Sequence, residues 1–417
     1  MKTNKGYTNV KIVTIKKNKS SVVYFILHSI FIFGCFFTTQ VNAQNINTNS
    51  EKLALQKNAP NLIIITTDGL RWQEVFGGVD TSIANQNKFN HGDSAYIAKK
   101  YGATNADERK KKLLPFLFSN TSLQNNSNSS VIKKGNEKSI IVFGDRNTNN
   151  KAAVENPHWF SYPGYNELLT GYADPAVNSN DYKPNPHSNL FAFLNKQSAY
   201  QGKVAAFGAW DAFDRILNEK VSGFPVINAF ESITQVLSDP TSKMLGNLLA
   251  DSYKPFKEVE CLDVFTHYQA MHYLKTKQPK AMFISYGETD EWAHHGNYSN
   301  YLDAANMVDK WIGDIWNFVQ AMPGYKDNTY ILLTTDHGRG FGSAWTDHGA
   351  DVNGANATWF AIIGPPALNS NAKELFGKPL VTNAQTNTIY QKQLAATMAK
   401  LLGIEFTAEH PIGNPIY

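Results

Sequence analysis

One short run of residues restricts the fold of this chain more than any other. Leu62-Ile63-Ile64-Ile65-Thr66-Thr67 is a continuous apolar, β-branched stretch that ends at Asp68-Gly69. A strand without polar alternation is buried on both of its faces, as the strands of a parallel sheet are. The run therefore predicts a central strand in a sheet that helices cover on both sides.

Similar patterns recur along the chain. Further short strands are predicted at Val204–Phe207, Ala281–Tyr286, Tyr330–Thr335 and Trp359–Ile363. Helical periodicity appears at Thr388–Leu402 and at Tyr301–Met322, where the residues near one face are Met307, Val308, Trp311, Ile315 and Val319. Alternating strands and helices predict an α/β fold of three layers, with a mostly parallel sheet in the middle.

The composition divides the chain into segments. Residues 44–59 are polar and aperiodic and are expected to form a linker, 60–404 the main domain and 405–417 a C-terminal tail. The range 175–280 holds one clear strand pattern, so we expect it to include an insertion that caps the active site. Residues 119–136 are rich in Asn and Ser and predict a surface loop.

The first 43 residues have the pattern of an export signal. Lysines precede the apolar run Val22–Phe37, and Val41-Asn42-Ala43 offers small residues for cleavage. The run is shorter than the ~20 residues that a spanning helix needs. We expect an exported protein, periplasmic or secreted, with no membrane span in the mature chain. Lipidation at Cys35 is the weaker alternative, because Phe33 is bulky where a small residue is usual.

The charge of the chain excludes one class of partner. The formal net charge is +4, but six lysines and no acidic residue precede Gln44, and without them 33 basic residues face 35 acidic ones. A balance near zero gives no basic surface for nucleic acid. Removal of the signal also leaves Cys261 as a lone cysteine in an apolar stretch, which predicts a buried, unreactive thiol.

Acidic and histidine side chains follow three of the predicted strands. Asp68 follows the first strand, Asp290 and His294 follow Ala281–Tyr286, and Asp336-His337 and later His348 follow Tyr330–Thr335. In an open α/β sheet, ligands gather at the carboxyl ends of the strands. Carboxylates and imidazoles suit zinc, and six of them are too many for one tetrahedral ion but enough for two.

A nucleophile is offered by the segment from His158 to Gly171. Ser161 precedes a short helical stretch that closes at Thr170-Gly171. A serine at such a helix start has backbone N–H groups and the helix dipole beside it, which favours anions such as phosphate. The alternative is a purely structural role, in which Ser161 only caps the helix.

These motifs, in this order, resemble the alkaline phosphatase superfamily. Asp68-Gly69-Leu70-Arg71-Trp72 resembles the first metal motif of nucleotide pyrophosphatases/phosphodiesterases, and Ser161-Tyr162-Pro163 with Leu169-Thr170-Gly171 resembles their nucleophile helix, where Thr is usual. Asp290 with His294 and Gly296 is similar to the Asp-x-x-x-His motif of the superfamily. Thr335-Asp336-His337-Gly338 through His348 resembles phosphopentomutase in its His-to-His spacing. The resemblance covers most of residues 60–365 and implies an alkaline-phosphatase-like sandwich.

The resemblance implies two metal sites and a phosphoserine mechanism. One metal would be held by Asp290, His294 and His348, and the other by the remaining ligands, which are Asp68, Asp336, His337 and the oxygen of Ser161. His294 is preferred over its neighbour His295 for the four-residue spacing. Zinc is the expected metal and manganese the alternative. Ser161 would attack a small-molecule phosphate ester, and a metal-activated water would release the phosphoserine.

Several alternatives stay open. A sulfatase needs a formylglycine with Arg four residues on, where Tyr165 stands. The other alternative functions are that of a phosphoglycerate-mutase-like enzyme and that of a non-catalytic metal-binding relative. Monoester and diester substrates differ in what contacts the phosphate, and the candidate substrate-binding residues are Asn178, Asn180, Arg71 and Arg146. The match at Arg71-Trp72 favours a phosphodiesterase-like architecture.

Overall fold

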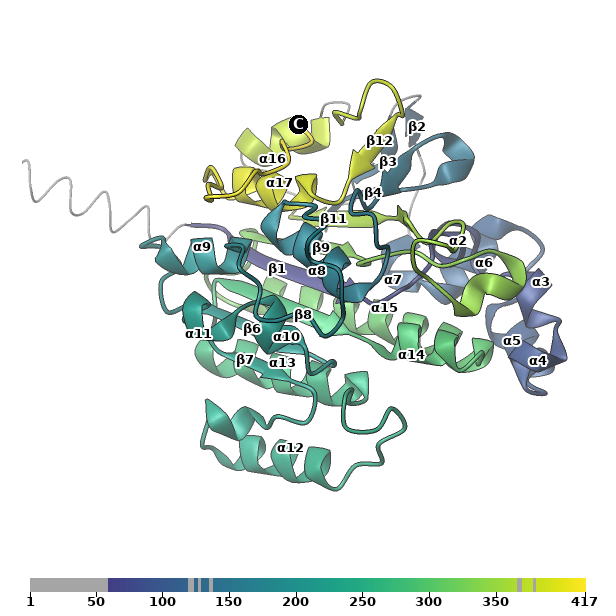
Figure 1. Cartoon of the computed structure of the whole chain (residues 1–417), viewed down its shortest axis with the longest axis horizontal. Helices are drawn as coiled ribbons and strands as arrows, with labels where there is room; N and C mark the ends of the chain where they lie inside the picture. Colours follow the sequence, from purple (N-terminus) through teal and green to yellow (C-terminus); the bar gives the residue numbers. More distant parts are fainter. Residues whose placement is uncertain (1–58, 119–123, 127–128, 135–137, 366–369, 378–379) are drawn as a thin grey trace, which may run out of the picture. The chain divides into compact units, whose positions relative to one another are not determined.

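The predicted central strand is observed as β1 (Asn61–Thr67). In a computed structural model, which describes residues 59–118, 124–126, 129–134, 138–365, 370–377 and 380–417, β1 pairs in parallel with β8 (Ala281–Tyr286) on one side and with β9 (Thr329–Thr334) on the other. The export signal, the linker up to residue 58 and Cys35 lie outside the described residues. Figure 1 shows β1 among its neighbours in the sheet.

Within the described residues, the main sheet has nine strands in the order β2-β3-β4-β11-β9-β1-β8-β6-β7. Pairing is parallel from β9 to β7 and antiparallel from β2 to β9, so β11 and β3 run opposite to the other strands. The other six strands are β2 (Gln124–Asn126), β3 (Ser129–Lys134), β4 (Ser139–Phe143), β6 (Val204–Gly208), β7 (Val226–Asn228) and β11 (Phe360–Gly364). A small second sheet contains β10 (Ala357–Thr358), β5 (Lys151–Ala153) and β12 (Thr388–Tyr390).

Both faces of the sheet are buried under helices, which confirms the predicted α/β fold. Side chains alternate along β1: Leu62 and Ile64 join one hydrophobic core, and Ile63 and Ile65 join the other. The first core includes α8 (Ser161–Thr170), α9 (Leu190–Lys196), α10 (Phe213–Ile216), α16 (Ser370–Gly377) and α17 (Gln393–Leu401). The second includes α2 (Trp72–Gly77), α3 (Thr81–Ala84), α4 (Asn87–Asn90), α5 (Ser94–Tyr101), α6 (Ala106–Leu113), α7 (Pro115–Phe118), α13 (Asp263–Lys277), α14 (Glu288–His294) and α15 (Tyr298–Ala321). The remaining helices are α11 (Glu219–Ser222) and α12 (Pro240–Ala250).

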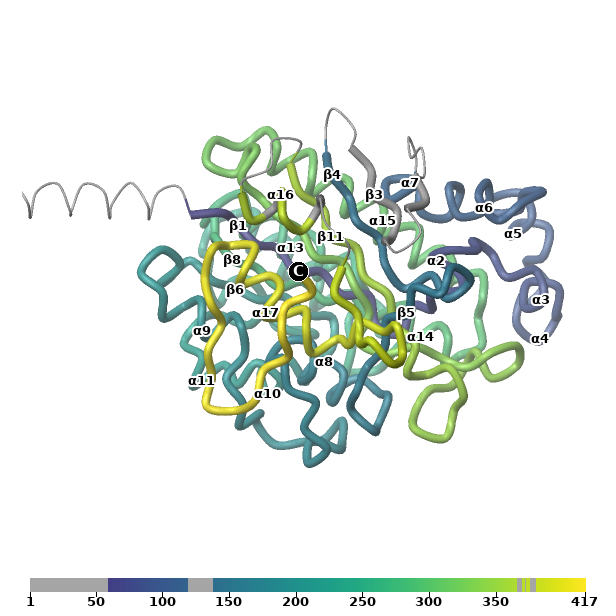
Figure 2. Tube along the Cα trace, turned by 90° about the horizontal axis from the view of Figure 1, so that it is seen from above, coloured from purple at the N-terminus to yellow at the C-terminus, as the bar shows by residue number. Residues whose placement is uncertain are grey.

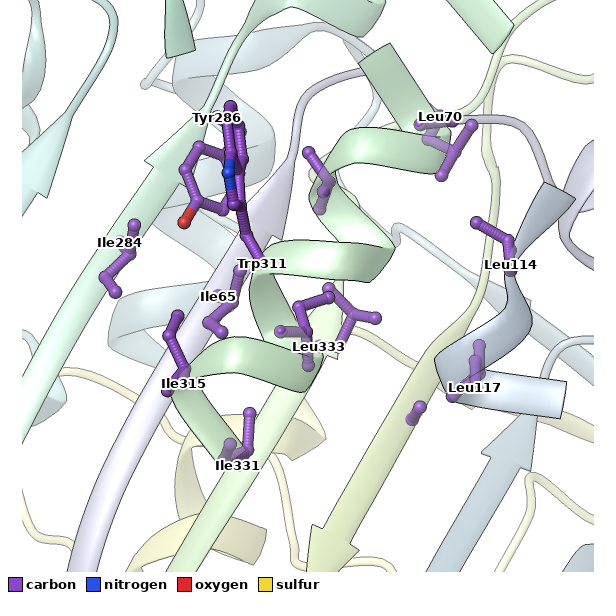
Figure 3. Close-up of a cluster of buried hydrophobic side chains, with 14 of the residues drawn as sticks. Ile65, Leu70, Leu114, Leu117, Ile284, Tyr286, Trp311, Ile315, Ile331 and Leu333 are labelled. Carbon is purple, nitrogen blue, oxygen red and sulfur yellow. The ribbon is translucent and has the colours of Figure 1, made fainter. Parts of the chain in front are cut away.

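The long helix α15 lies across the central strands. Trp311 packs against Tyr286 at the end of β8, and Ile315 lies near Ile65 of β1 (Figure 3). The apolar stripe of α15 agrees with the predicted periodicity except at one position, because Met307 is 42% exposed. No helix in the described part of the chain combines the length and the apolar character that crossing a bilayer demands.

Three local predictions are wrong. The predicted helix at Thr388–Leu402 begins only at Gln393, because Thr388–Tyr390 pairs with β5 instead. The predicted loop at residues 119–136 contains β2 and β3, and β3 extends the main sheet by pairing with β4. Val226–Asn228 is a strand, β7, that we did not predict.

The range 175–280 is largely part of the main fold. β6 pairs with β8, β7 pairs with β6, and α13 packs on the sheet. Much of the range that we expected to be an insertion therefore belongs to the sheet and to a helix packed on it. The segment 405–417 is packed as well: Gly413 donates its N–H to the carbonyl of Gly171, and Ile416 is fully buried. Figure 2 shows this segment running over the region of α8 and α17.

Candidate metal centre

The three central strands deliver the predicted ligands to one edge of the sheet. Asp68 follows β1, Asp290 and His294 lie in α14 directly after β8, and Asp336-His337 follows β9. Because these strands are parallel neighbours in the order β9-β1-β8, their carboxyl ends meet. Strand order thus brings together side chains that are more than 200 residues apart in the sequence.

The first ligand group consists of Asp68, Asp336 and His337. Nε2 of His337 lies 3.3 Å from Oδ1 of Asp68 and 3.4 Å from Oδ2 of Asp336. The hydroxyl oxygen of Ser161 lies 3.4 Å from the same nitrogen. All four side chains are buried, and they meet at one point although they come from three different elements.

The spacing in this group fits a tetrahedral ion. Ligand atoms at 2.0–2.1 Å from a tetrahedral zinc ion lie about 3.3–3.4 Å apart. Oδ1 of Asp68 and Oδ2 of Asp336 are buried and both face Nε2 of His337, and within the described residues neither atom makes a hydrogen bond with good geometry. Buried carboxylate oxygens are normally hydrogen-bonded or paired with a cation. A cation bound between these two atoms would therefore stabilise them.

The electrostatics of this group lead to the same conclusion. Burial, followed by repulsion from Asp290, raises the pKa of the Asp68 carboxyl. Burial and then Asp68 raise the pKa of Asp336 in the same way. Burial by itself would lower the pKa of His337, but the neighbouring carboxylates outweigh it and raise the pKa to about 9. The site favours positive charge, which a divalent ion supplies.

The second ligand group surrounds Asp290. Nε2 of His294 lies 3.0 Å from Oδ2 of Asp290 and 3.0 Å from Nε2 of His348. Nε2 of His348 lies 3.7 Å from Oδ1 of Asp290, and His337 is also within reach of this carboxylate at 3.8 Å. Burial lowers the pKa of His348 well below its usual value, so its imidazole is neutral, as a metal ligand must be.

The structure separates the two neighbouring histidines. The ring of His295 is directed to the backbone carbonyl of Glu291 at 2.7 Å, and its side chain is 53% exposed. His294, and not His295, therefore has its Nε2 beside the other ligands of the second group. This is the arrangement that the four-residue spacing from Asp290 predicts.

Ser161 is the first residue of α8, and Phe160 occupies the N-cap position without a side-chain cap. The hydroxyl of Ser161 is thus not used to cap the helix and instead faces His337. Gly164, one turn later, lies against Asp336: a Cβ on this glycine would be 2.4 Å from the carbonyl oxygen of Asp336. This close approach brings the start of α8 to the end of β9.

The backbone before Ser161 is held in an unusual conformation. Trp159 has a φ of 55°, in the left-handed region that side chains other than Gly rarely adopt. Oδ1 of Asn156 accepts from the N–H of Trp159, and the Trp159 carbonyl accepts from the N–H of Gly349, next to His348. The loop before Ser161 is therefore bonded to the loop that carries a ligand of the other group.

The predicted substrate-binding residues lie in different surroundings. Oδ1 of Asn180 accepts from the N–H of Tyr162, which places Asn180 at the turn of Ser161. Asn178 is exposed. Arg146 donates to the carbonyl of Ala152, and among the described residues its contacts include neither Ser161 nor a metal ligand. Arg71 is buried and paired with Glu74, so it is a structural residue.

Two residues of the site were missed at the sequence level. The hydroxyl of Tyr165 donates to Oδ2 of Asp68 at 3.0 Å and so orients that ligand. Arg339 is buried, and its guanidinium contacts Asp290. The position of Arg339 directly after the Asp336-His337-Gly338 motif was the signal that could have marked it as a residue of the site. Burial opposes the ionisation of Asp290, but Arg339, His294 and His348 together outweigh it and lower the pKa of this carboxyl well below its usual value.

One segment of the chain matches a known superfamily. Residues 256–352 match the family model described as the Metalloenzyme superfamily, which is alkaline-phosphatase-like. The superfamily includes metal-dependent sulfatases and hydrolases or transferases of phosphoesters. The match confirms the resemblance at the level of the superfamily, and the nearer likeness to nucleotide pyrophosphatases/phosphodiesterases stays a prediction. No curated protein matches the chain.

Solved structures with a similar arrangement have low sequence identity to this chain. A 2-O GAG sulfatase is 14% identical, with a TM-score of 0.48 over 84% of this chain and 72% of that one. The lipoteichoic acid synthase LtaP from Listeria monocytogenes is 12% identical, with a TM-score of 0.47 over 86% and 76%. A phosphonate monoester hydrolase of Agrobacterium radiobacter is 13% identical, with a TM-score of 0.46 over 86% and 76%.

Proposed function

We propose that this chain, whose residues 256–352 carry the Metalloenzyme segment, is an exported two-metal hydrolase of phosphate esters that acts through Ser161. The observation that supports this most directly is the position of the Ser161 hydroxyl, 3.4 Å from Nε2 of His337, the nitrogen that also lies 3.3 Å from Oδ1 of Asp68 and 3.4 Å from Oδ2 of Asp336. A buried serine at a metal-ligand cluster is a suitable nucleophile. The signal pattern of residues 1–43 supports export.

Two ion positions follow from the two ligand groups. Asp68, Asp336 and His337 would hold one ion together with Ser161, and Asp290, His294 and His348 would hold the other. Divalent ions, zinc first and manganese as the alternative, supply a lowered hydroxyl pKa and neutralise charge on phosphoryl oxygens when they are bound.

The residues of the chain account for the chemistry around phosphorus. Oγ of Ser161 forms a bond to phosphorus and loses its proton to solvent, while the bond from phosphorus to the leaving oxygen breaks and that oxygen gains a proton. Water then cleaves the phosphoserine and restores the hydroxyl. The positive end of the α8 dipole lies at Ser161 and would stabilise the anionic phosphoryl group, as helix N-termini do, although the N–H of Tyr162 is bonded to Asn180 and Pro163 has none.

The surroundings of Ser161 favour a diester substrate. A monoester carries one more negative charge and usually needs an added cation to bind. Arg71 is paired with Glu74, and Arg146 donates to the carbonyl of Ala152, so both candidates are engaged elsewhere. Asn180, a neutral side chain, is the candidate that lies at the turn of Ser161.

Tyr165 weighs against the sulfatase alternative. The formylglycine pattern needs an arginine four residues after the modified residue, and this position is Tyr165. Its hydroxyl is bonded to Asp68 and lies 2.9 Å from the hydroxyl of Ser285, so it serves the ligand set in a different way. Ser161 is expected to remain serine.

The test is a pair of hydrolysis assays on zinc-loaded protein lacking residues 1–43. We expect bis-p-nitrophenyl phosphate to be cleaved faster than p-nitrophenyl phosphate. Ser161→Ala should abolish both activities while both ions remain bound, because the carboxylates and imidazoles are intact. Ser161→Thr, which keeps a hydroxyl, is the matched control and should retain measurable turnover.

Two results would change the proposal. More than a few per cent of wild-type activity in Ser161→Ala would exclude Ser161 as the nucleophile. Turnover of a sulfate ester that exceeds turnover of both phosphate esters would move the assignment to the sulfatase alternative.

A further inference from the structure

Arg339 is a buried cation inside the metal centre. It follows His337 by two residues and is 1% exposed. Its guanidinium makes four polar contacts. Nε donates to the carbonyl of Trp345 at 2.9 Å, Nη2 donates to the carbonyl of Thr346 and lies 3.3 Å from Nδ1 of His294, and Nη1 donates to Oδ1 of Asp290.

These contacts belong to the two segments that supply the second ligand group. Asp290 and His294 lie on α14, which follows β8. Trp345 and Thr346 belong to a 3₁₀ turn, Gly342–Thr346, that leads directly to His348. One side chain thus bonds to both sources of the three ligands, which lie 54 or more residues apart in the sequence.

The two oxygens of the Asp290 carboxylate have different contacts. Oδ1 contacts Arg339, whereas Oδ2 lies 3.0 Å from Nε2 of His294. Gly69 closes the other side: a Cβ on this glycine would lie 2.6 Å from Oδ1 of Asp290 and 2.9 Å from Nη1 of Arg339. The carboxylate therefore has little room to rotate. Its Oδ1 lies 3.7 Å from Nε2 of His348 and 3.8 Å from Nε2 of His337, and its Oδ2 faces His294.

We propose that Arg339 is a positioning residue for the metal site of Asp290, His294 and His348: it fixes the orientation of the Asp290 carboxylate among the imidazoles, and it fixes the loop that carries His348. The inference rests on the metal sites of the proposed function. It assigns no contact between Arg339 and substrate, so Arg339 acts through the ligands.

The shape of the side chain explains why this residue is an arginine. A guanidinium offers five N–H donors in a rigid plane, and here they reach three oxygens in three directions. An ammonium carries the same charge but lacks this planar fork. Lysine should therefore preserve the charge balance and lose part of the geometry, which separates the two roles by experiment.

The test measures zinc binding and needs no substrate. The full chain is stripped with chelator and titrated with zinc against a competing chromophoric chelator, and bound zinc is counted after dialysis. Wild type should hold two ions. Arg339→Gln should hold one ion with wild-type affinity and the second with affinity reduced about 10–100-fold, the range for loss of a partner that orients a ligand. Arg339→Lys should fall between the two.

Matched variants separate this role from general damage. Arg109→Gln removes a guanidinium that donates to the carbonyl of Gly77, away from the ligands, and should leave both affinities unchanged. Asp336→Asn should weaken the other ion and spare the one near Arg339. If Arg339→Gln fails to fold, Arg339→Lys loaded with cobalt gives a second readout, because the visible spectrum of cobalt reports ligand geometry at the affected site.

The outcomes are distinct. Two zinc ions bound with wild-type affinity in Arg339→Gln, or an unchanged cobalt spectrum and zinc affinity in Arg339→Lys, would overturn the inference. Failure of the proposed function has another signature, in which wild type binds two ions and hydrolyses none of the esters. Wild type that binds fewer than two ions would overturn both.

Discussion

The hydroxyl oxygen of Ser161 lies 3.4 Å from Nε2 of His337, although the two residues are 176 positions apart. Ser161 begins α8 and His337 follows β9, so the contact depends on how closely the helix approaches the strand end. Gly164 sets that approach, because it lies directly on the backbone of Asp336. The position of Ser161, the proposed nucleophile, therefore depends on a residue that bears no side chain.

Gly164→Ala should displace the nucleophile. The added Cβ would lie 2.4 Å from the carbonyl oxygen of Asp336, a distance that requires the helix or the strand end to move. We expect at least a tenfold loss of ester hydrolysis and a destabilisation of ~1–3 kcal/mol, as overpacking typically costs. Gly77→Ala is the control, because a Cβ there meets open space. Equal rates for the two variants in the hydrolysis assay would contradict this.

Trp159 should tolerate glycine better than alanine. Its φ of 55° costs a residue with a Cβ roughly 1–2 kcal/mol, and glycine adopts this conformation freely. Both substitutions remove the indole ring, so their difference isolates the backbone. We expect Trp159→Gly to be more stable than Trp159→Ala by ~1 kcal/mol in urea unfolding. Equal stability would mean that the loop between Asn156 and Gly349 does not impose this φ.

Glu74→Gln should be strongly destabilising. Glu74 is fully buried, contacts the guanidinium of Arg71 and accepts from the hydroxyl of Tyr298 at 2.8 Å. Neutralising it leaves the buried charge of Arg71 without its main partner, which typically costs ~3–5 kcal/mol. Asp314→Asn, in the exposed pair with Lys310, should cost ~0–1 kcal/mol. Thermal unfolding of both variants at the same metal load checks the contrast, and similar melting temperatures would refute it.

Asp309 should make the stability pH-dependent. Its oxygens accept from the N–H groups of Phe116 and Leu117, and burial raises its pKa to about 7. The unfolded chain releases this proton near pH 4, so between these values the folded state binds more protons and the free energy of unfolding falls as the pH rises. Relative to wild type, Asp309→Asn should gain ~2.5 kcal/mol between pH 5 and pH 8 in urea unfolding.

The size of the gain, and not the stability at one pH, is the test at Asp309. Asparagine leaves one of the two backbone N–H groups without a carboxylate oxygen, and that cost is the same at every pH. A stability difference between the variant and wild type that stays constant from pH 5 to pH 8 would show that Asp309 is ionised throughout. Chelator-treated samples remove the contribution of metal binding.

Much of the ligand set could be predicted, because its geometry follows from local rules. A run such as Leu62–Thr67 has no polar alternation, so it predicts a buried strand, and parallel strands deliver their following residues to one edge. The confirmed α/β fold rests on this pattern. The predicted ligands do lie together, although their role as ligands is still to be measured.

The features that were missed depend on long-range partners. The range Thr388–Leu402 has helical periodicity, but its first residues, Thr388–Tyr390, pair with β5. The tertiary pairing therefore outweighs the local preference for a helix. Arg339 contacts Asp290, 49 residues away, and no local pattern encodes that meeting. The same holds for Arg71, which was a candidate phosphate ligand until its burial with Glu74 became visible.

The order β9-β1-β8 has a consequence for how the protein matures. Asp68 and Asp336 become neighbours only after β1 has inserted between two strands that follow it by more than 200 residues. Such pairings of high sequence separation form late and slowly. Zinc would therefore bind at this pair only after the chain has folded. Because it would bind the native state alone, it would raise the free energy of unfolding. The isolated segment 256–352 lacks Asp68 and Ser161, so zinc could not stabilise it through this site.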